Sequence, residues 1–306
     1  MVAWEMVQLM QFDLALRAWV VQHRLPILSS TLWGLSAIGR GGIVWMAIAA
    51  LLTVTKRLRP RDLVLDIGAW GYPFNRANYA MDCEPYETRG YYNREFFRDN
   101  PLPPQGGAVE YFTRETWIER DICDRKPFPF GDKELDFVIC SHTLEDIRDP
   151  LWVCSEMVRI AKRGYLEIPS RLKESCRGDH PGIVGLSHHR WLIDIGDDSV
   201  AFWMKPHLIH SHWRYSLPPR VCRSLTEEQQ VQWLFWEGSF RFHERIIHGN
   251  ENQLAELKRF VDAHSPYSPA VRAAGAVQEG CRTLAMRVGR KLRKIANAGR
   301  AAKVGA

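Results

Sequence analysis

Short apolar runs bounded by glycine and proline recur between residues 62 and 170 and predict buried parallel strands. The expected strands are 63–67, 78–84, 118–122, 135–142 and 165–168. Between the last two, Asp149 precedes a proline, and apolar residues then recur every three to four positions. This pattern predicts a helix that Asp149 caps and that ends near Gly164. Strands joined in this way are typical of an α/β fold with a parallel sheet.

A second pattern lies further along the chain. Residues 191–195 and 199–204 are rich in apolar and aromatic side chains and flank Gly-Asp-Asp, which predicts a β-hairpin. Thr226 and the polar residues after it predict the start of a helix. The loop from Ser170 to Arg190 is rich in glycine and histidine. Its place in the chain suggests that it covers the active site.

The first expected strand ends in a turn that contains Asp66, Gly68 and Gly71. A glycine turn at this place lets backbone approach a nucleotide-like ligand, because no Cβ stands in the way. The carboxylate beside it favours a cationic or hydroxyl-rich ligand over a bare phosphate. Asp82 follows at the end of the second strand, where an acidic side chain can hold a ribose. Because this gap is short, we expect a clipped turn around Pro73 in place of a first helix.

The order of these motifs resembles that of class I S-adenosyl-L-methionine-dependent methyltransferases, and most of all their type 11 group. The resemblance covers about residues 62–170 and includes the run from Pro127 to Pro150, which contains Pro-Phe-Pro-Phe, Leu-Asp-Phe, Ser-His-Thr-Leu-Glu-Asp and Asp-Pro. It implies a Rossmann-like, seven-stranded mixed sheet with helices on both faces and an antiparallel last strand. The hairpin at 191–204 is expected to supply that antiparallel pair.

The resemblance also implies roles for individual residues. Asp66, Gly68 and Gly71 are expected to line the methionine end of the cofactor. Asp82 is expected to hold the ribose and Asp121 the adenine. Ser141 and His142 are expected beneath the cofactor, facing the substrate.

Two positions depart from the family pattern. Trp70 stands where the family usually has glycine, and Asp146 stands where it has histidine. A catalytically inactive scaffold that binds the cofactor is therefore an alternative. A NAD-dependent oxidoreductase is a weaker one, because it needs a G-x-G-x-x-G turn followed by a full helix, and Trp70 and Pro73 disfavour that.

Histidines are the candidate general bases, because imidazole titrates near neutral pH. His142, His188 and His189 are the residues considered for removing a proton from an acceptor hydroxyl. The spacing of His207, His210 and His212 matches no recurring zinc pattern, so no metal is expected. The expected reaction is in-line transfer of a methyl group to oxygen, or less favourably nitrogen, of a glycan, a lipid-linked or a small-molecule substrate.

The net charge of +6 is unevenly distributed. Residues 1–60 carry +4 and residues 265–306 carry +8, which leaves −6 for the body between them. An acidic body argues against a nucleic-acid substrate, which requires a basic face. We therefore expect an apolar extension at 1–60, a methyltransferase domain at 61–264 and a basic tail at 265–306.

The two ends suggest contact with a membrane surface. Residues 27–55 are largely apolar but are interrupted by Arg40, and the uninterrupted part is shorter than the roughly 20 residues of a bilayer span. This region weakly resembles the first membrane segment of phosphatidic-acid-phosphatase-like proteins, in Phe-Asp-Leu-Ala-Leu from Phe12 and in 35–42, but the catalytic Ser-Gly-His motif of that family is absent. Residues 284–295 form a basic amphipathic pattern. The alternatives are helices packed on the body and a solvated tail.

Cysteine usage bears on the compartment. The chain has seven cysteines and no C-x-x-C pair, and several lie in buried patterns. This is typical of free thiols in a reducing environment rather than of a disulfide framework or a zinc site. No removable signal peptide is expected. We expect a cytoplasmic protein, with attachment to the cytoplasmic face of a membrane left open.

Overall fold

The computed structural model describes residues 57–177, 182–274, 277 and 281. The predictions made for residues 1–56 and for the basic amphipathic segment at 284–295 lie outside the described residues. Within the described part of the chain, no helix combines the length and the apolar character needed to cross a bilayer.

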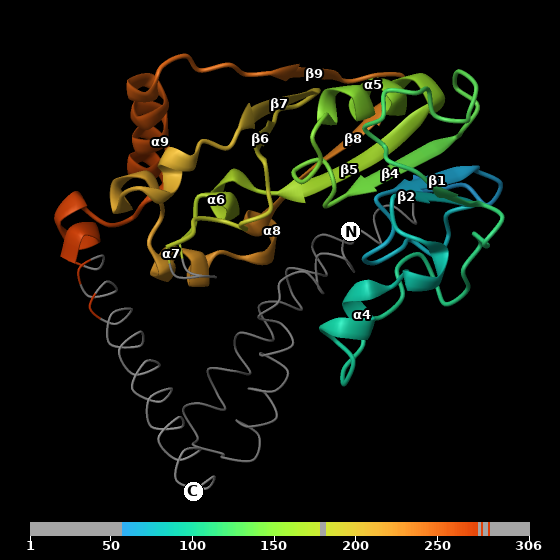
Figure 1. Cartoon of the computed structure of the whole chain (residues 1–306), viewed down its shortest axis with the longest axis horizontal. Helices are drawn as coiled ribbons and strands as arrows, with labels where there is room; N and C mark the ends of the chain where they lie inside the picture. The colour runs from blue at the N-terminus through green and yellow to red at the C-terminus, as the bar shows by residue number, and fades with distance from the viewer. Residues whose placement is uncertain (1–56, 178–181, 275–276, 278–280, 282–306) are drawn as a thin grey trace, which may run out of the picture. The chain divides into compact units, whose positions relative to one another are not determined.

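A six-stranded sheet lies at the centre of the structure (Figure 1). In spatial order its strands are β3 (Trp117–Glu119), β2 (Tyr79–Asp82), β1 (Val64–Ile67), β4 (Phe137–Ser141), β5 (Arg163–Pro169) and β8 (Val231–Glu237). The first five are parallel and β8 is antiparallel to β5. The five strands expected from the apolar runs are confirmed. The order reverses between β1 and β4, which is the switch point where ligands bind in open α/β sheets.

The hairpin at 191–204 forms as expected but in a different sheet. β6 (Trp191–Ile195) and β7 (Ser199–Met204) pair antiparallel, and β9 (Arg241–Glu244) adds parallel to β7. The expectation that this hairpin closes the main sheet is therefore wrong, and the described residues give that sheet six strands rather than seven. β8 takes the edge position because it pairs with β5 along its whole length. Gly164 of β5 fits closely there, since an added Cβ would lie 2.7 Å from the ring of Trp236.

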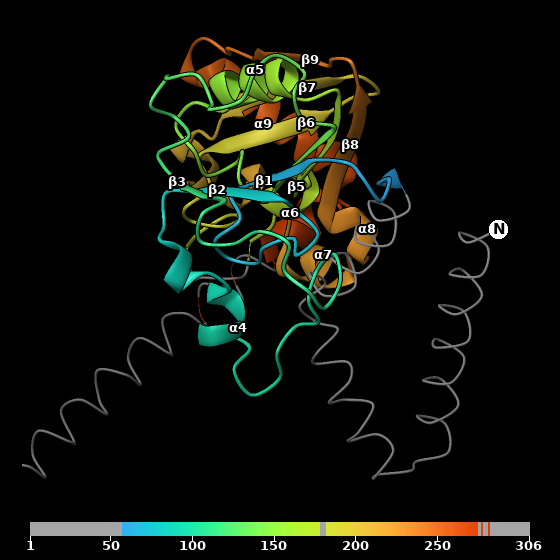
Figure 2. The same ribbon diagram turned by 90° about the vertical axis from the view of Figure 1, so that its right-hand side faces the viewer.

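The two sheets share one hydrophobic core. The Gln232 side chain of β8 accepts a hydrogen bond from the Ile195 amide and donates one to the Ile193 carbonyl, both at 3.1 Å. Apolar side chains from alternate positions of β1, β4 and β5 pack in the same cluster as Trp191 and Phe202 of the second sheet. Figures 1 and 2 show α5 (Pro150–Ile160) and β9 next to each other on one side of the main sheet.

The connections between the strands determine which part of the sheet edge is left uncovered by helices. Between β1 and β5, α5 is the one long helix, and Asp149 caps it by accepting a hydrogen bond from the Trp152 amide at 3.2 Å. Residues 68–78, between β1 and β2, form no helix, as Pro73 led us to expect. Thr226 begins a helix with a capping box, also as expected, but that helix is one turn long and leads directly into β8. That helix is α8 (Glu227–Gln230), and the further helical elements are η1 (Tyr86–Thr88), α4 (Tyr91–Glu95), α6 (Arg171–Glu174), η2 (His207–His210), η3 (Trp213–Tyr215), α7 (Pro219–Ser224) and α9 (Asn250–His264).

A disulfide links Cys176 to Cys222. This corrects the expectation of free thiols rather than disulfides for these two cysteines, while the other five are free. Cys176 follows α6 and Cys222 lies in α7. The bond therefore ties the chain just after α6 to the helices that precede β8. A bridge that closes 46 residues stabilises the fold by about 4 kcal/mol in the chain-entropy model. No spacing motif pointed to this pair, because the two residues come together only through the tertiary fold.

We predict that thiol counting will detect this bond. Protein unfolded without reductant should take up five alkyl labels, matching the five free cysteines, and reduced protein should take up seven, as read by mass spectrometry. The Cys222→Ser variant is the control, since its six thiols should label equally with and without reductant. Seven labels on unreduced wild-type protein would contradict the bond.

Candidate active site

The carboxyl ends of the parallel strands β1, β4 and β5 meet at one edge of the sheet, and the candidate residues gather there. Gly68 follows β1, His142 follows β4, and Glu167 lies near the end of β5. The next segments along the chain, including the loop before β6, bring further charged side chains to this edge.

Gly68 is required by its surroundings. Its φ is +78°, and an added Cβ would lie 2.0 Å from the Thr143 hydroxyl oxygen. Its amide donates to the Met81 carbonyl at 2.8 Å, which ties the turn to β2. Asp66, two residues earlier, is buried and accepts a hydrogen bond from the Phe74 amide at 2.8 Å. Burial raises the pKa of Asp66 to about 7, with the nearby Asp82 adding to the effect and the Phe74 amide opposing it.

Asp82 holds the glycine turn in place. One carboxylate oxygen accepts from the Trp70 amide at 3.0 Å, and the other accepts from the Glu84 amide at 3.1 Å. A carboxylate oxygen has two lone pairs, so each still has room for a ligand hydroxyl. Asp82 thus supports the turn and keeps the capacity expected of a ribose ligand.

Trp70 is held by the segment after β2. Its indole nitrogen donates to the Thr88 hydroxyl at 2.9 Å, and its ring stacks on Tyr91 at 4.4 Å between centroids. Gly71 packs against Tyr92, whose ring lies 2.9 Å from where a Cβ would stand. The large side chain in the glycine turn therefore anchors α4 against the turn.

Asp121, expected at the adenine, lies after β3 and forms an ion pair with Arg148 at 2.6 Å. It also accepts from the Cys123 amide at 2.8 Å. Burial acts against ionisation, but the Cys123 amide and Arg148 outweigh it and hold the pKa of Asp121 below its ordinary value. A nucleobase that binds here must share the Asp121 carboxylate with the Arg148 guanidinium.

His142 lies between two buried carboxylates. Its backbone has a left-handed φ of 49°, its Nε2 is 3.3 Å from Glu167, and its Nδ1 is 3.5 Å from Glu145. Burial disfavours the charged ring, but Glu145 and Glu167 outweigh burial and raise the pKa of His142 to about 10. The ring is therefore an imidazolium at neutral pH. This revises its expected role, because a protonated ring donates and cannot accept a proton. Ser141 lies alongside, with its hydroxyl 3.5 Å from Glu167.

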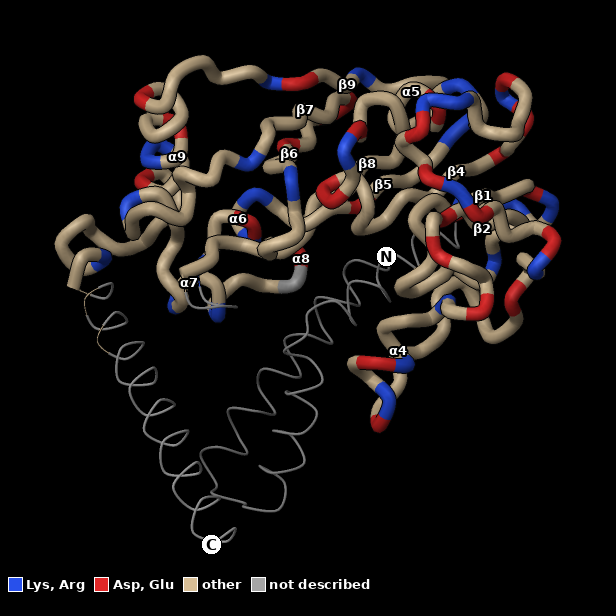
Figure 3. Tube along the Cα trace, in the orientation of Figure 1, with Lys and Arg blue, Asp and Glu red and all other residues tan. Residues whose placement is uncertain are grey.

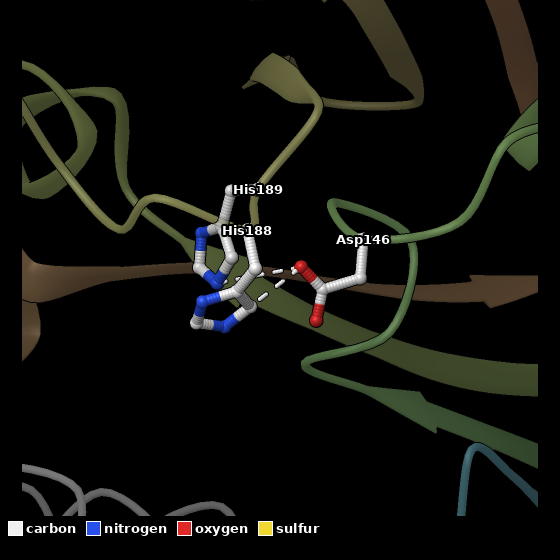
Figure 4. A group of neighbouring side chains, drawn as sticks. All are labelled: Asp146, His188 and His189. Carbon is white, nitrogen blue, oxygen red and sulfur yellow. Dashed lines mark ion pairs between the residues drawn. The ribbon is translucent and has the colours of Figure 1, made fainter.

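A second group lies above this edge (Figure 4), and we call Asp146, His188 and His189 the roof cluster. Asp146 Oδ1 is 3.7 Å from His189 Nε2 and 4.0 Å from His188 Nε2. The other nitrogen of His189 pairs with buried Glu174 at 2.8 Å, and Glu174 also binds Lys205 at 2.8 Å. Burial opposes protonation of His189, but Glu174 outweighs it and raises the pKa of His189.

The roof cluster adjoins the first group. Glu145 directly precedes Asp146, and burial together with the charges of Asp146 and Glu145 raises the pKa of Tyr92. Tyr92 in turn packs on the glycine turn. The predicted residues therefore fall into a turn around Gly68 and a roof around His189, with Tyr92 between them.

The three other histidines considered for metal binding do not gather. His210 accepts a hydrogen bond from the Val184 amide at 3.0 Å, and His212 accepts one from the Arg214 amide at 3.3 Å. His207 is exposed. Among the described residues, the roof cluster is the one group of three side chains placed to hold a metal ion.

Several residues of the site were missed in the sequence. Glu167 carried a usable signal, because it is a charged residue inside the apolar run of β5. Glu145 stood in a recognised motif but received no role. Glu174 and Lys205 gave no local signal, since their partners come from distant parts of the chain.

Comparisons with known proteins give similarity in part of the chain. No family model matches the sequence, and no curated protein matches it. A Haloferax volcanii structure, a complex between the Trm112 methyltransferase activator and a methyltransferase, matches at TM-score 0.29 and 17% identity over 46% of this chain and 58% of that chain. A SAM-dependent methyltransferase from Aquifex aeolicus matches at 0.27 and 17% over 43% and 69%. Another from Thermotoga maritima matches at 0.28 and 19% over 45% and 59%.

These matches are partial in both directions. The chain spans little more than half of the Haloferax volcanii and Thermotoga maritima chains. At such TM-scores and identities, the function has to rest on the geometry of the site itself.

We predict that Gly68→Ala will lower the free energy of unfolding by about 2 kcal/mol or more, because strain at a positive φ adds to the clash with Thr143. Gly238→Ala is the matched control. Gly238 has a φ of +73° and no atom within 4 Å of where a Cβ would stand, so this change should cost only about 1 kcal/mol. Denaturant unfolding measures both. Equal losses would show that Thr143 does not restrict the turn.

We predict that the His142 ring stays protonated up to about pH 9 and titrates near pH 10 in spectra of histidine-labelled protein. Its folded pKa is raised, so its stabilising effect is present below pH 6.5 and is lost as the pH rises through about 10. Glu167→Gln should shift the midpoint down towards 6.5, because it removes one of the two carboxylates. Tyr165→Phe keeps both carboxylates and should leave the midpoint high. A wild-type midpoint near 6.5 would refute the imidazolium assignment.

Proposed function

We propose that this chain binds S-adenosyl-L-methionine and transfers its methyl group to an acceptor oxygen. The observation that carries the proposal is the turn at Gly68. It lies at the switch point between β1 and β4, admits only glycine, and is flanked by the carboxylates of Asp66 and Asp82.

The charge of the turn supports a sulfonium nucleoside over a dinucleotide. A pyrophosphate is bound by the amino-terminal end of the helix that follows the glycine turn. Here residues 68–78 form no helix, and the Asp82 carboxylate, together with Asp66 in its ionised form, would repel phosphate. A cofactor with a positive sulfur, an amino group and two ribose hydroxyls suits these acids. The NAD-dependent alternative is disfavoured for the same reason.

Different residues contact different parts of the cofactor. Asp82 accepts the ribose hydroxyls, and Asp66 holds the turn through the Phe74 amide. Asp121 and Arg148 border the adenine side. Bound S-adenosyl-L-methionine supplies an electrophilic methyl group. Catalysis then rests on alignment of the acceptor with that group.

Proton removal falls to the roof cluster. His142 is charged and therefore donates a hydrogen bond or balances Glu145 and Glu167. His189 has one nitrogen fixed by Glu174, so the other nitrogen faces Asp146. His188 is exposed beside it. An acceptor hydroxyl placed under this roof would lose its proton there.

The acceptor is a glycan, a lipid-linked saccharide or a small hydroxylated metabolite. Exposed aromatic rings of Tyr92 and Phe96 lie next to the glycine turn, and such rings stack on sugar faces. Figure 3 shows acidic and basic residues interspersed along the described elements, whereas a nucleic-acid substrate favours clustered basic residues. Cytoplasmic location and membrane contact through the two ends remain part of this proposal, although the Cys176–Cys222 disulfide removes the cysteine argument for that location.

A catalytically inactive scaffold is the second candidate. Trp70 favours it, because a large indole, held by Thr88 and Tyr91, stands in the turn where the family pattern has glycine. Such a scaffold would bind the cofactor but release no labelled product.

We predict that Asp82→Ala will weaken S-adenosyl-L-methionine binding by about 10- to 100-fold in calorimetry, because hydrogen bonds to a charged group are lost. Asp99→Asn, an exposed acid on the loop after α4, is the control and should bind as the wild type does. Unchanged affinity in Asp82→Ala would remove the ribose assignment. Absence of binding to the wild type would end the proposal.

The same preparations decide between enzyme and scaffold. Cell extract incubated with methyl-labelled cofactor and wild-type protein should gain a labelled component that Asp82→Ala does not produce. Binding without any labelled product would favour the scaffold.

A further inference from the structure

We propose that the roof cluster of Asp146, His188 and His189 is a binding site for a divalent transition-metal ion, with zinc as the ion that fits best. The sequence led us to expect no metal, because the spacing of His207, His210 and His212 fits no zinc pattern, and the roof cluster was not considered for that role. Two imidazoles and one carboxylate are a common donor set of catalytic zinc sites, which keep a fourth position open.

The spacing of the ligand atoms suits such an ion. The two imidazole nitrogens and the Asp146 oxygen all lie within 4.8 Å of one another. Zinc bonds to these atoms are about 2.0–2.2 Å long, so tetrahedral ligand atoms stand about 3.4 Å apart. The distances from Asp146 to His189 and His188, 3.7 and 4.0 Å, need little adjustment. The His188 side chain is exposed and can approach the ion by rotating its side chain.

The surroundings of His189 are those of a metal ligand. Metal-binding histidines usually give their second nitrogen to a carboxylate, which fixes the ring and strengthens the ligand. His189 Nδ1 pairs with Glu174 at 2.8 Å, and Lys205 holds the other oxygen of Glu174 at 2.8 Å. All three side chains are buried. The Nε2 atom is thereby directed at Asp146 (Figure 4).

Buried carboxylate oxygens without hydrogen bonds provide an independent indication. Glu145 is 1% exposed, and among the described residues neither of its carboxylate oxygens has a hydrogen-bond partner. Asp146 Oδ1 is likewise buried without one. Buried carboxylates without partners are costly, and buried charges are normally paired or bind metals. A cation in the roof cluster would add positive charge near Glu145, whose counterion, the His142 ring at 3.5 Å, is shared with Glu167.

The ion would serve the reaction in a definite way, and this part rests on the proposed function. At the open position it would bind the acceptor hydroxyl and lower its pKa, so that the proton leaves to solvent before the methyl group arrives. His189 would then act as a ligand rather than as the base. Imidazole ligands favour zinc over magnesium, which prefers oxygen.

The test is titration of chelator-treated, full-length protein with Co²⁺, followed by displacement with Zn²⁺, in the absence of S-adenosyl-L-methionine. The wild type should bind one equivalent of Co²⁺ with the visible absorption of a tetrahedral site, and Mg²⁺ should not compete. His188→Ala and Asp146→Asn should weaken binding at least about tenfold, and Glu174→Gln by about 10- to 100-fold. His243→Ala removes an exposed histidine of β9 and should change nothing.

The outcomes are distinct. No cobalt absorption in the folded wild type, or equal binding in wild type, His188→Ala and Asp146→Asn, would overturn the site. Circular dichroism of each variant excludes unfolding as the cause of lost binding, and His188→Ala changes an exposed residue. Calorimetry with S-adenosyl-L-methionine on the same samples separates the two proposals, since metal binding without cofactor binding would refute only the proposed function.

Discussion

Buried negative charge at the carboxyl edge of the main sheet is the constraint on which the rest of the site depends. Glu145, Glu167 and Glu174 are all buried there, together with Asp66 at the end of β1. Such charges are tolerated only where cations or hydrogen-bond donors compensate them. The local structure supplies a specific partner for most of them, and this explains several otherwise unusual features.

The compensation is visible residue by residue. Asp66 accepts a hydrogen bond from the Phe74 amide, and this bond bends the chain after the glycine turn. Glu167 forms an ion pair with the His142 ring. The left-handed backbone of His142 brings that ring between two carboxylates. Glu174 takes Lys205 and His189. Glu145 shares the same His142 ring at 3.5 Å and has no hydrogen bond, so one cation faces two carboxylates and the edge keeps a local surplus of negative charge. A surplus of that sign selects cationic ligands, and both a sulfonium cofactor and a metal ion meet that requirement.

The strands could be predicted because their pattern is local. The apolar runs of β1, β4 and β5 are buried on both faces, and Asp149 followed by proline determined the start of α5. The partner of β5 could not be predicted in the same way. The hairpin of β6 and β7 and the strand β8 are equally apolar, and the choice between them depends on tertiary fit. The Trp236 ring against Gly164 and the bonds of Gln232 to β6 place β8 in the main sheet and the hairpin beside it.

The residues of the site also differ in whether a local sequence pattern or the tertiary fold determines their role. Gly68, Asp82 and the roof histidines could be selected from their types and their places in loops, whereas the partners that determine their charge could not. Asp146 illustrates the difference. In the sequence it is a departure from a family histidine and a reason to doubt catalysis. In the structure it stands opposite His188 and His189, so that the exchange of a histidine for an aspartate creates a set of two imidazoles and one carboxylate. A histidine at residue 146 would have given three imidazoles, a set that also binds zinc but contributes no negative charge of its own. The departure is therefore better understood as a change in what the roof binds than as the loss of a catalytic group.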